Sequence, residues 1–280
     1  MEYGDKHILV LGAGASGIGA SWVLAQVGAH VVLNDYKPVT LPATEEGRLV
    51  SAGVDIITGR QDESLLDGVD RIVISPGISL DIPIVKAAQA RGIDVVSEVE
   101  VAYELSKSPI VAVTGTNGKT TTTTLLTKVL EGTGKPVRVG GNIGDSLSEV
   151  AYSMPADGFL VAELSSYQLE TIKHFRPIGA IMLNITPDHL ARHKTMENYI
   201  AAKERIFENQ LSTDFMVLNI DDPIVADMKH CVPSHILEIS QHQVVSNGAY
   251  YDKGQCYVTK NGMATPVIGS ADIHIPGSHN

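Results

Sequence analysis

The sequence predicts an α/β protein built from two domains. Short apolar runs alternate with stretches of helical spacing along the 280-residue chain, the pattern of parallel sheets covered by helices. Two glycine-rich loops, at residues 12–17 and 115–118, each stand between an apolar run and a helix. A polar segment that ends in proline, residues 106–109, lies between them. We therefore expect a Rossmann-like domain at residues 1–107 and a P-loop-type mononucleotide-binding domain at residues 108–280.

Composition narrows the classes of protein before any motif is considered. The formal net charge of −11 argues against nucleic acid or an anionic membrane as a partner. The two cysteines, Cys231 and Cys256, stand in unrelated contexts, which fits a reducing cytoplasm. No apolar run approaches membrane-spanning length, and a strand begins at once near the N-terminus, so no signal peptide is expected. The expectation is a cytoplasmic monomer.

The first glycine loop has the dinucleotide-binding pattern. An apolar run at residues 7–11 leads into G-A-G-A-S-G at residues 12–17, a helix follows, and the next strand ends at Asp35. This pattern alone indicates phosphate or ribose near the loop and leaves the nucleotide open, so an NAD-dependent oxidoreductase is one alternative. Further strands are expected at residues 54–57, 71–74 and 93–96, and helices at 83–91 and 98–105.

The second glycine loop predicts a phosphate site. It follows the apolar run 110–113 and precedes a helix, so backbone N–H groups and a helix N-terminus can hold phosphate oxygens. Lys119 can reach the β- and γ-phosphates, and the Thr120 hydroxyl can bind Mg²⁺. The strict pattern has glycine where this chain has Val113, so the loop is a compact variant. The alternative is an ordinary glycine turn beside an exposed lysine.

Glu163 and His189 each follow an apolar strand of the second domain. Carboxyl ends of parallel strands share one edge of a sheet, so both should meet Lys119 there. A carboxylate and an imidazole could hold a divalent metal against phosphates, although Mg²⁺ prefers oxygen ligands to histidine. Alternatively, each is merely solvated. Strands are expected at residues 136–139, 159–162, 178–183 and 215–218, a helix at 196–209, and β-structure from residue 244 onward.

Lys203 interrupts an apolar helical stripe formed by Tyr199, Ile200, Ile206 and Phe207. A lysine on such a stripe is costly unless it is paired or extends its ammonium into water. Burial would lower its pKa and make the neutral amine available. The pattern leaves both alternatives open.

Taken together, the motifs resemble the Mur ligases of peptidoglycan synthesis. The likeness covers essentially the whole chain, and within the family the first domain resembles the members that add D-glutamate. It rests on residues 12–17, Asp35, 75–78, Glu98 with Glu100, 114–121, 141–144, 163–166, 184–189 and 201–203.

This resemblance implies an ATP-dependent amide ligase. ATP would phosphorylate the carboxylate of UDP-N-acetylmuramoyl-L-alanine, and the amine of D-glutamate would attack the resulting acyl phosphate. Mg²⁺ would accompany ATP, and the first domain would bind UDP rather than NAD. Another Mur ligase, a folylpolyglutamate-type synthetase and a non-catalytic nucleotide-binding module remain as alternatives.

The resemblance also assigns roles to residues. Lys119, His189 and Lys203 would be catalytic, with Lys203 carbamylated. The metal ligands would be Thr120, Glu163, His189 and the Lys203 carbamate. The remaining contacts would be Gly115, Thr116, Asn117, Gly118, Lys119, Thr120 and Thr121 for ATP; Ser16, Asp35, Tyr36, Lys37, Ser75, Pro76 and Gly77 for UDP; and Asn142 and Ser165 for the muramoyl-alanine part.

The chain departs from the family pattern in two places. Ala191 stands where the family usually has an acid, two residues after the histidine. The last residues, 275–280, read I-P-G-S-H-N, a motif after which the family continues into a third domain that closes on ATP and binds D-glutamate. The expectation is therefore a chain that lacks that domain and does not turn over alone.

Overall fold

The structure is a computed structural model that describes residues 3–274, so the motif at 275–280 lies outside the described residues. Its contacts divide the chain into two compact units. The first unit comprises Met1–Pro109 and Thr127–Phe175, and the second comprises Ile110–Leu126 and Arg176–Asn280. The expected domain division after residue 107 stays a prediction.

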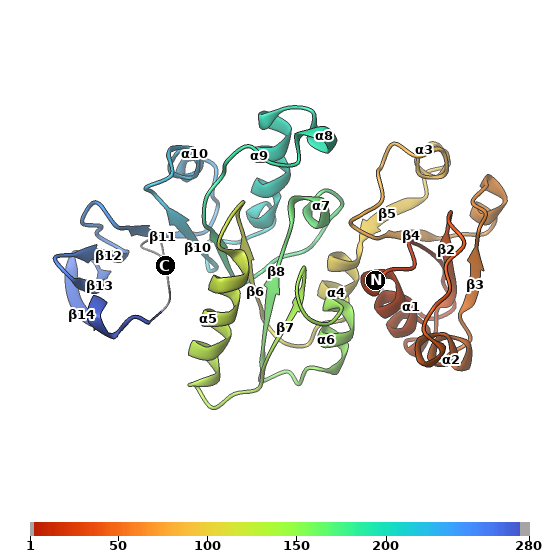
Figure 1. The fold of residues 1–280 in the computed structure, drawn as a ribbon, viewed down its shortest axis with the longest axis horizontal. Helices are drawn as coiled ribbons and strands as arrows, with labels where there is room; N and C mark the ends of the chain where they lie inside the picture. Colours follow the sequence, from red (N-terminus) through yellow and green to blue (C-terminus); the bar gives the residue numbers. More distant parts are fainter. Residues whose placement is uncertain (1–2, 275–280) are drawn as a thin grey trace. The chain divides into compact units, whose positions relative to one another are not determined.

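The first unit contains a five-stranded sheet in the order β3-β2-β1-β4-β5, with every neighbouring pair parallel (Figure 1). The α/β fold with parallel strands is thereby confirmed. Its strands are β1 (His7–Leu11), β2 (His30–Asp35), β3 (Asp55–Thr58), β4 (Arg71–Ile74) and β5 (Asp94–Ser97). Its helices are α1 (Ala15–Gln26), α2 (Ala43–Ser51), the 3₁₀ turn η1 (Glu63–Leu66), α3 (Pro83–Ala90) and α4 (Glu98–Leu105).

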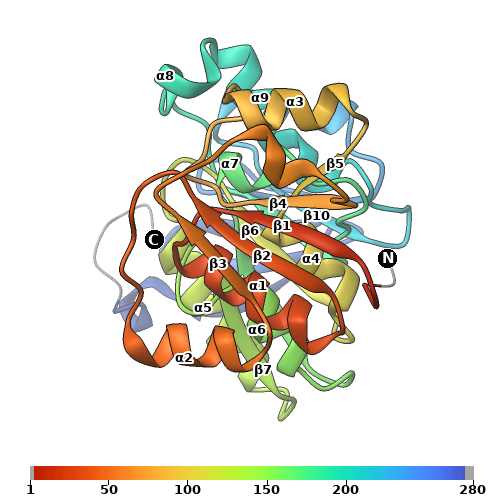
Figure 2. The same ribbon diagram turned by 90° about the vertical axis from the view of Figure 1, so that its right-hand side faces the viewer.

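Alternation along β1 builds a core on each face of this sheet. Ile8 and Val10 pack with Leu24 of α1, whereas Leu9 and Leu11 pack with Ile84 of α3. Side chains of a strand point alternately to opposite faces, so an uninterrupted apolar run needs helices on both. Figure 2 shows α1 and α2 on one side of the strands and α3 on the other.

The rest of the first unit contains the parallel strands β7 (Val137–Gly141) and β8 (Phe159–Glu163). Two short helices accompany them, α6 (Leu147–Ser153) and α7 (Ser166–Leu169). Helix α6 packs against α1 and α4.

The second unit holds a sheet in the order β14-β13-β12-β11-β10-β9-β6. These strands are β6 (Ile110–Thr114), β9 (Gly179–Met182), β10 (Phe215–Asn219), β11 (His235–Ser240), β12 (Gly248–Asp252), β13 (Gln255–Lys260) and β14 (Met263–Gly269). Pairing is parallel from β6 to β12 and antiparallel from β12 to β14, which confirms the β-structure expected after residue 244.

Along the chain, most helices of the second unit come after β9 and before β11. They are α8 (Leu190–His193), α9 (Met196–Glu204), η2 (Arg205–Phe207), α10 (Pro223–Asp227) and η3 (Met228–His230), with η4 (Ser270–Asp272) after β14. Helix α5 (Lys119–Glu131) begins in this unit. The helix expected at 196–209 is shorter, because α9 ends at Glu204 and tightens into a 3₁₀ turn, a common helix ending. No helix among residues 3–274 is long and apolar enough to cross a membrane.

Candidate nucleotide-binding site

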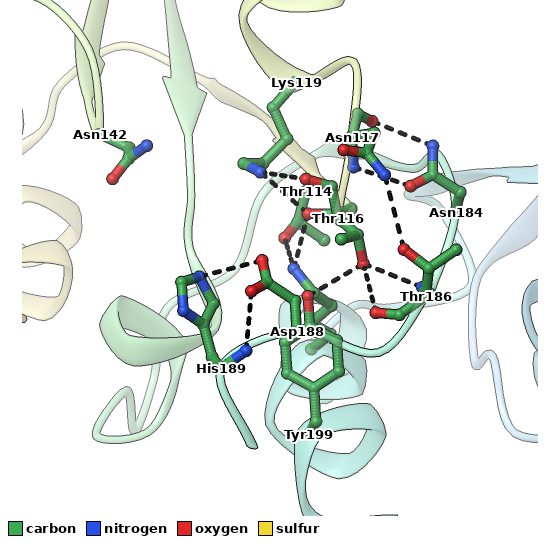
Figure 3. A network of polar contacts seen from close by, with 12 residues as sticks. Thr114, Thr116, Asn117, Lys119, Asn142, Asn184, Thr186, Asp188, His189 and Tyr199 are labelled. Atoms are coloured by element: carbon green, nitrogen blue, oxygen red, sulfur yellow. Dashed lines mark hydrogen bonds and ion pairs between the residues drawn. The ribbon is translucent and has the colours of Figure 1, made fainter. Parts of the chain in front are cut away.

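The phosphate loop lies between β6 and α5, in the predicted order of strand, loop and helix (Figure 3). Gly115 and Gly118 have φ angles of +149° and +82°, which L side chains rarely adopt. A Cβ on Gly115 would lie 2.9 Å from the Cβ of Leu183, so the loop also needs glycine for space. Thr120 and Thr121 lie in the first turn of α5, where backbone N–H groups have no partner within the helix.

The segment after β9 fixes the loop. The backbone N–H of Thr116 donates to the Asn184 carbonyl at 2.9 Å, and that of Asn117 donates to Asn184 Oδ1 at 2.8 Å. Thr116 Oγ1 accepts the Thr186 N–H at 3.0 Å and lies 3.0 Å from the Tyr199 hydroxyl (Figure 3). The loop is therefore held in place by contacts within the protein.

Two lysines donate to one carbonyl of this loop. Lys119 Nζ donates to the carbonyls of Gly115 and Thr116 at 3.1 and 2.8 Å. Lys203 Nζ donates to Gly115 O at 2.7 Å and to Thr114 Oγ1 at 3.3 Å. It also lies 5.0 Å from the centre of the Tyr199 ring.

Lys203 is buried, with 2% of its surface exposed. Its amine therefore does not extend into water, which was one of the two alternatives that the sequence left open. Burial lowers the pKa of its amine from 10.5 to about 7, with a smaller effect from the Lys119 charge, while Asp188 opposes the shift. Burial therefore favours the uncharged form of this amine. An uncharged amine is a nucleophile, which an ammonium is not.

His189 lies at the start of α8 in a left-handed conformation, with φ of +54°. Asp188 Oδ2 lies 3.3 Å from His189 Nε2, and Asp188 Oδ1 accepts the His189 backbone N–H at 2.8 Å. Asp188 thus supplies a carboxylate beside the imidazole in a chain that has Ala191 at the usual acidic position. The sequence analysis missed this role, although the adjacency of the two residues was a signal.

Glu163 and Asn142 form a pair within the first unit. Asn142 donates its backbone N–H to the Glu163 carbonyl at 2.8 Å and its Nδ2 to Glu163 Oε1 at 2.9 Å. Glu163 is buried at the end of β8. Ser165 has a structural role, since it caps α7 in a reciprocal arrangement with Gln168. That the edge holding Lys119 and His189 also includes Glu163 stays a prediction.

The first glycine loop is closed by Asp35 and Ser75. Asp35 accepts the backbone N–H of Ala13 at 3.0 Å and that of Lys37 at 2.9 Å. Ser75 Oγ donates to the Gly12 carbonyl at 3.2 Å.

The other residues predicted to bind UDP surround this loop. Ser16 lies in the first turn of α1, Tyr36 is exposed, and Pro76 and Gly77 form the turn after β4. Asp35 and Ser75 thus join the ends of the two strands beside β1 to the fingerprint loop, and the role of these residues in binding UDP stays a prediction.

Within residues 3–274, no three His, Cys, Asp or Glu side chains gather closely enough to hold a metal ion by themselves. Oxygen atoms of a bound phosphate or of a modified side chain could act as metal ligands at the phosphate loop. Such ligands are the kind that Mg²⁺ uses, since it is usually held by one or two carboxylates together with phosphates and water.

Two family matches cover most of the chain. Residues 113–280 match the Mur ligase middle domain, and residues 6–97 match the N-terminal domain of MurD-like Mur ligases. The chain therefore belongs to the Mur ligase family. Within that family it is a MurD-like member.

Curated relatives extend the likeness along the full chain. A UDP-N-acetylmuramoylalanine--D-glutamate ligase of Thermoanaerobacter sp. (strain X514) is 45% identical over 280 residues, which are 100% of this chain and 62% of the relative. The ligase of the same name from Halalkalibacterium halodurans is 42% identical over 279 residues, 100% of this chain and 61% of that relative. The chain thus spans about 62% of the length of the relatives it matches.

Solved structures share the fold. A UDP-N-acetylmuramate:L-alanyl-gamma-D-glutamyl-meso-diaminopimelate ligase from Neisseria meningitides aligns with a TM-score of 0.64 at 20% identity, over 98% of this chain and 89% of that one. A murein peptide ligase from Psychrobacter arcticus aligns with a TM-score of 0.58 at 19% identity, over 98% and 62%. At these identities the likeness concerns the fold alone.

Proposed function

We propose that this chain is the UDP-substrate-binding and ATP-binding part of a cytoplasmic ligase that adds D-glutamate to UDP-N-acetylmuramoyl-L-alanine. The observation that carries the proposal is the buried Lys203 amine, which lies against a preformed phosphate loop in a chain 45% identical to a D-glutamate ligase. A neutral amine at this position fits a ligase that carbamylates a lysine. The reaction of an NAD-dependent oxidoreductase does not require such a buried neutral amine beside a phosphate loop.

The residues of the loop fit a nucleoside triphosphate. Gly115 to Thr121 would hold ATP through backbone N–H groups, the start of α5 and the Lys119 ammonium. ATP would supply the phosphoryl group that converts the substrate carboxylate into an acyl phosphate, from which phosphate can leave. Lys119 would move from the carbonyls of Gly115 and Thr116 to the phosphates. Its charge would then neutralise phosphate oxygens.

Carbamylation would give the Lys203 side chain a negative charge in place of the positive charge of an ammonium. The neutral amine nitrogen attacks the carbon of CO₂, the nitrogen loses a proton to solvent, and a carbamate anion forms. Its oxygens, with Thr120, Glu163 and His189, would provide ligands for Mg²⁺, and the Asp188 carboxylate would orient the imidazole. An unmodified ammonium at the same place would repel the ion, by several kcal/mol at ~4 Å and an effective dielectric of ~20.

In the first unit, Ser16 and the 75–77 turn would hold the UDP diphosphate, and Asp35, Tyr36 and Lys37 would lie near uracil. Asn142 and Ser165 would contact the muramoyl-alanine part. Because the chain spans about 62% of its relatives' length, their D-glutamate site and full activity belong to the proposal. The expectation that this stretch of chain does not turn over alone stays a prediction.

A thermal-shift titration tests the proposal. UDP-N-acetylmuramoyl-L-alanine and Mg-ATP should each raise the melting temperature, and NAD should not at concentrations where the UDP sugar does. UDP-N-acetylmuramate without alanine, tested in parallel, distinguishes a sister ligase. Lys119→Met should abolish the shift by Mg-ATP and keep the shift by the UDP sugar. Stabilisation by NAD with none by the UDP sugar would overturn the proposal.

A further inference from the structure

Helix α4 carries two fully buried carboxyl groups that the proposed reaction does not use. Glu98 is 2% exposed and Glu100 is 0% exposed. Ionisable side chains are almost never buried to this extent unless their hydrogen-bonding groups are engaged. The hydrogen-bond partners of each carboxyl group therefore show which segments of the chain α4 holds in place.

Glu100 has a structural explanation. Its two carboxylate oxygens accept the backbone N–H groups of Lys173, His174 and Phe175 at 2.8, 2.8 and 3.1 Å. Three donors satisfy most of its hydrogen-bonding capacity. This residue fixes the 173–175 segment, which lies far along the chain from the phosphate loop.

Glu98 holds the beginning of α6. Its Oε1 accepts the Ser146 hydroxyl and the Ser148 backbone N–H, each at 2.7 Å, whereas its Oε2 is buried without a hydrogen-bond partner among the described residues. Ser146 occupies the N-cap position of α6, where its hydroxyl lies 2.9 Å from Ser148 Oγ but caps no backbone N–H of the helix. The carboxyl group of Glu98 therefore caps α6 from another helix, the task that an N-cap side chain usually performs. Packing there is close, since a Cβ on Gly19 would lie 2.2 Å from Ser146 Oγ.

The loop at residues 141–145 runs directly into this capped start. At its other end, Asn142 is bonded twice to Glu163. Gly141 has φ of +109°, and a Cβ there would lie 2.4 Å from the Glu163 carbonyl. The loop is thus held at both ends, by Glu163 on one side and by Glu98 on the other. The Gly141 backbone N–H donates to the Asp145 carbonyl at 3.3 Å, so the two ends of the loop are joined directly.

We propose that Glu98 is a positioning residue: by fixing Ser146 and Ser148, it holds the 141–145 loop in place and keeps Asn142 paired with Glu163. This inference rests on the proposed function, in which Asn142 contacts the muramoyl-alanine part of the substrate and Glu163 binds the metal. In this proposal Glu98 itself contacts neither the substrate nor the metal. Its effect passes entirely through the loop.

The first test is independent of any ligand. Hydrogen exchange of the Asn142 amide, which donates to the Glu163 carbonyl, reports whether the loop stays in place. Glu98→Ala removes both bonds and should speed this exchange by at least about tenfold, the factor that one lost hydrogen bond to a carboxyl group accounts for. Glu98→Gln keeps the Oε1 acceptor and should restore wild-type exchange. Ser146→Ala removes one of the two bonds and should give an intermediate rate even if Glu98→Ala fails to fold.

Glu100→Gln is the matched control. It removes the charge of a carboxyl group that is equally buried and two positions away on the same helix. It should lower the melting temperature and leave the exchange of the Asn142 amide unchanged under native conditions. If Glu100→Gln sped the exchange of that amide as much as Glu98→Ala does, the effect would be general destabilisation, and the inference would be overturned.

The second test compares affinities for UDP-N-acetylmuramoyl-L-alanine and for UDP, measured by calorimetry on this chain. The ratio isolates the muramoyl-alanine contact. Asn142→Ala should lower the ratio, Glu98→Ala should lower it by about tenfold, and Glu98→Gln and Glu100→Gln should leave it at the wild-type value. If wild type binds the UDP sugar and Glu98→Ala keeps the ratio, the positioning role is wrong. If wild type does not bind the sugar while the exchange results hold, the proposed function fails and the role of Glu98 in the loop stands.

Discussion

Replacing Lys203 by methionine should stabilise the unliganded protein at neutral pH. Methionine has a similar unbranched shape and no charge, so it fills the same space without an ionisable group. The lysine is 2% exposed, and burial lowers its pKa from 10.5 to about 7. Because the folded state disfavours the protonated amine, this lysine destabilises the fold wherever the unfolded chain would carry the proton.

The magnitude follows from the two pKa values. The folded pKa is the lower one, so the penalty is fully present below about pH 7 and disappears as the pH rises to about 10.5. Across that window the free energy of unfolding of wild type should rise by about 1.4 kcal/mol per pH unit relative to the variant, about 4–5 kcal/mol in all as an upper value. Methionine loses the hydrogen bonds to Gly115 O and Thr114 Oγ1, at about 1 kcal/mol each. The variant should therefore be more stable by about 1–3 kcal/mol at pH 7 and less stable than wild type near pH 10.

Urea denaturation of both proteins in CO₂-free buffer, from about pH 6 to about pH 10, measures this crossing. Lys86→Met is the matched control. Because Lys86 is exposed, the free energy of unfolding of this variant should follow the same pH dependence as that of wild type. A constant difference between wild type and Lys203→Met across the whole range would refute the reasoning. It would mean that the Lys203 amine keeps its proton in the folded state.

Three further outcomes follow from the structure. With ¹³C-labelled bicarbonate, wild type should show a carbamate carbon resonance that is absent from Lys203→Arg, because guanidinium stays charged and cannot be carbamylated; a resonance in both proteins would exclude Lys203 as its site. Gly115→Ala should cost more than about 1–3 kcal/mol of stability, since φ is +149° and the added Cβ would lie 2.9 Å from a neighbouring side chain, whereas Gly47→Ala in the exposed part of α2 should stabilise slightly in the same denaturation assay. Arg71→Met leaves the buried Glu104 carboxylate without its guanidinium partner and should cost about 3–5 kcal/mol, and adding Glu104→Gln should recover part of that loss if the cost comes from the unpaired charge.

Periodicity predicted where Lys203 points but could not predict its state. A stripe of apolar residues shows which face of a helix is buried, and α9 does bury Tyr199 and Lys203. Whether the ammonium reaches water depends on what lies beyond the end of the side chain. Thr114 and Gly115, almost ninety residues earlier, occupy that place, and no local pattern contains this information.

Local backbone geometry explains why the partner of His189 was missed. The sequence analysis considered an acid two residues after the histidine, the position typical of the family. The left-handed conformation of His189 instead brings its imidazole beside Asp188, the preceding residue. A positive φ at a non-glycine residue is uncommon, so adjacency alone was weak evidence.

Strand register, by contrast, could have predicted the pair of Asn142 and Glu163. Parallel pairing sets Gly141 opposite Glu163 at the ends of β7 and β8. Both strands were expected from their apolar runs, so the residue after Gly141 had to lie near the end of β8. The fold was therefore more accessible from the sequence than the contacts within the site, which depend on register and on side chains that meet across long separations.

The unliganded phosphate loop combines a rigid frame with exchangeable contacts. Its backbone N–H groups at Thr116 and Asn117 are held by Asn184, and these bonds need not change when a ligand binds. Its carbonyls, in contrast, are satisfied by Lys119 and Lys203, the two side chains with proposed roles toward phosphate and metal. Gly115 O accepts from both lysines, so it would keep a donor if Lys119 moved to a phosphate as proposed. The close approach of two amines to one carbonyl also helps to keep Lys203 uncharged, since Lys119 lowers its pKa. The same arrangement therefore supports the loop and is consistent with the proposed modification of the Lys203 amine.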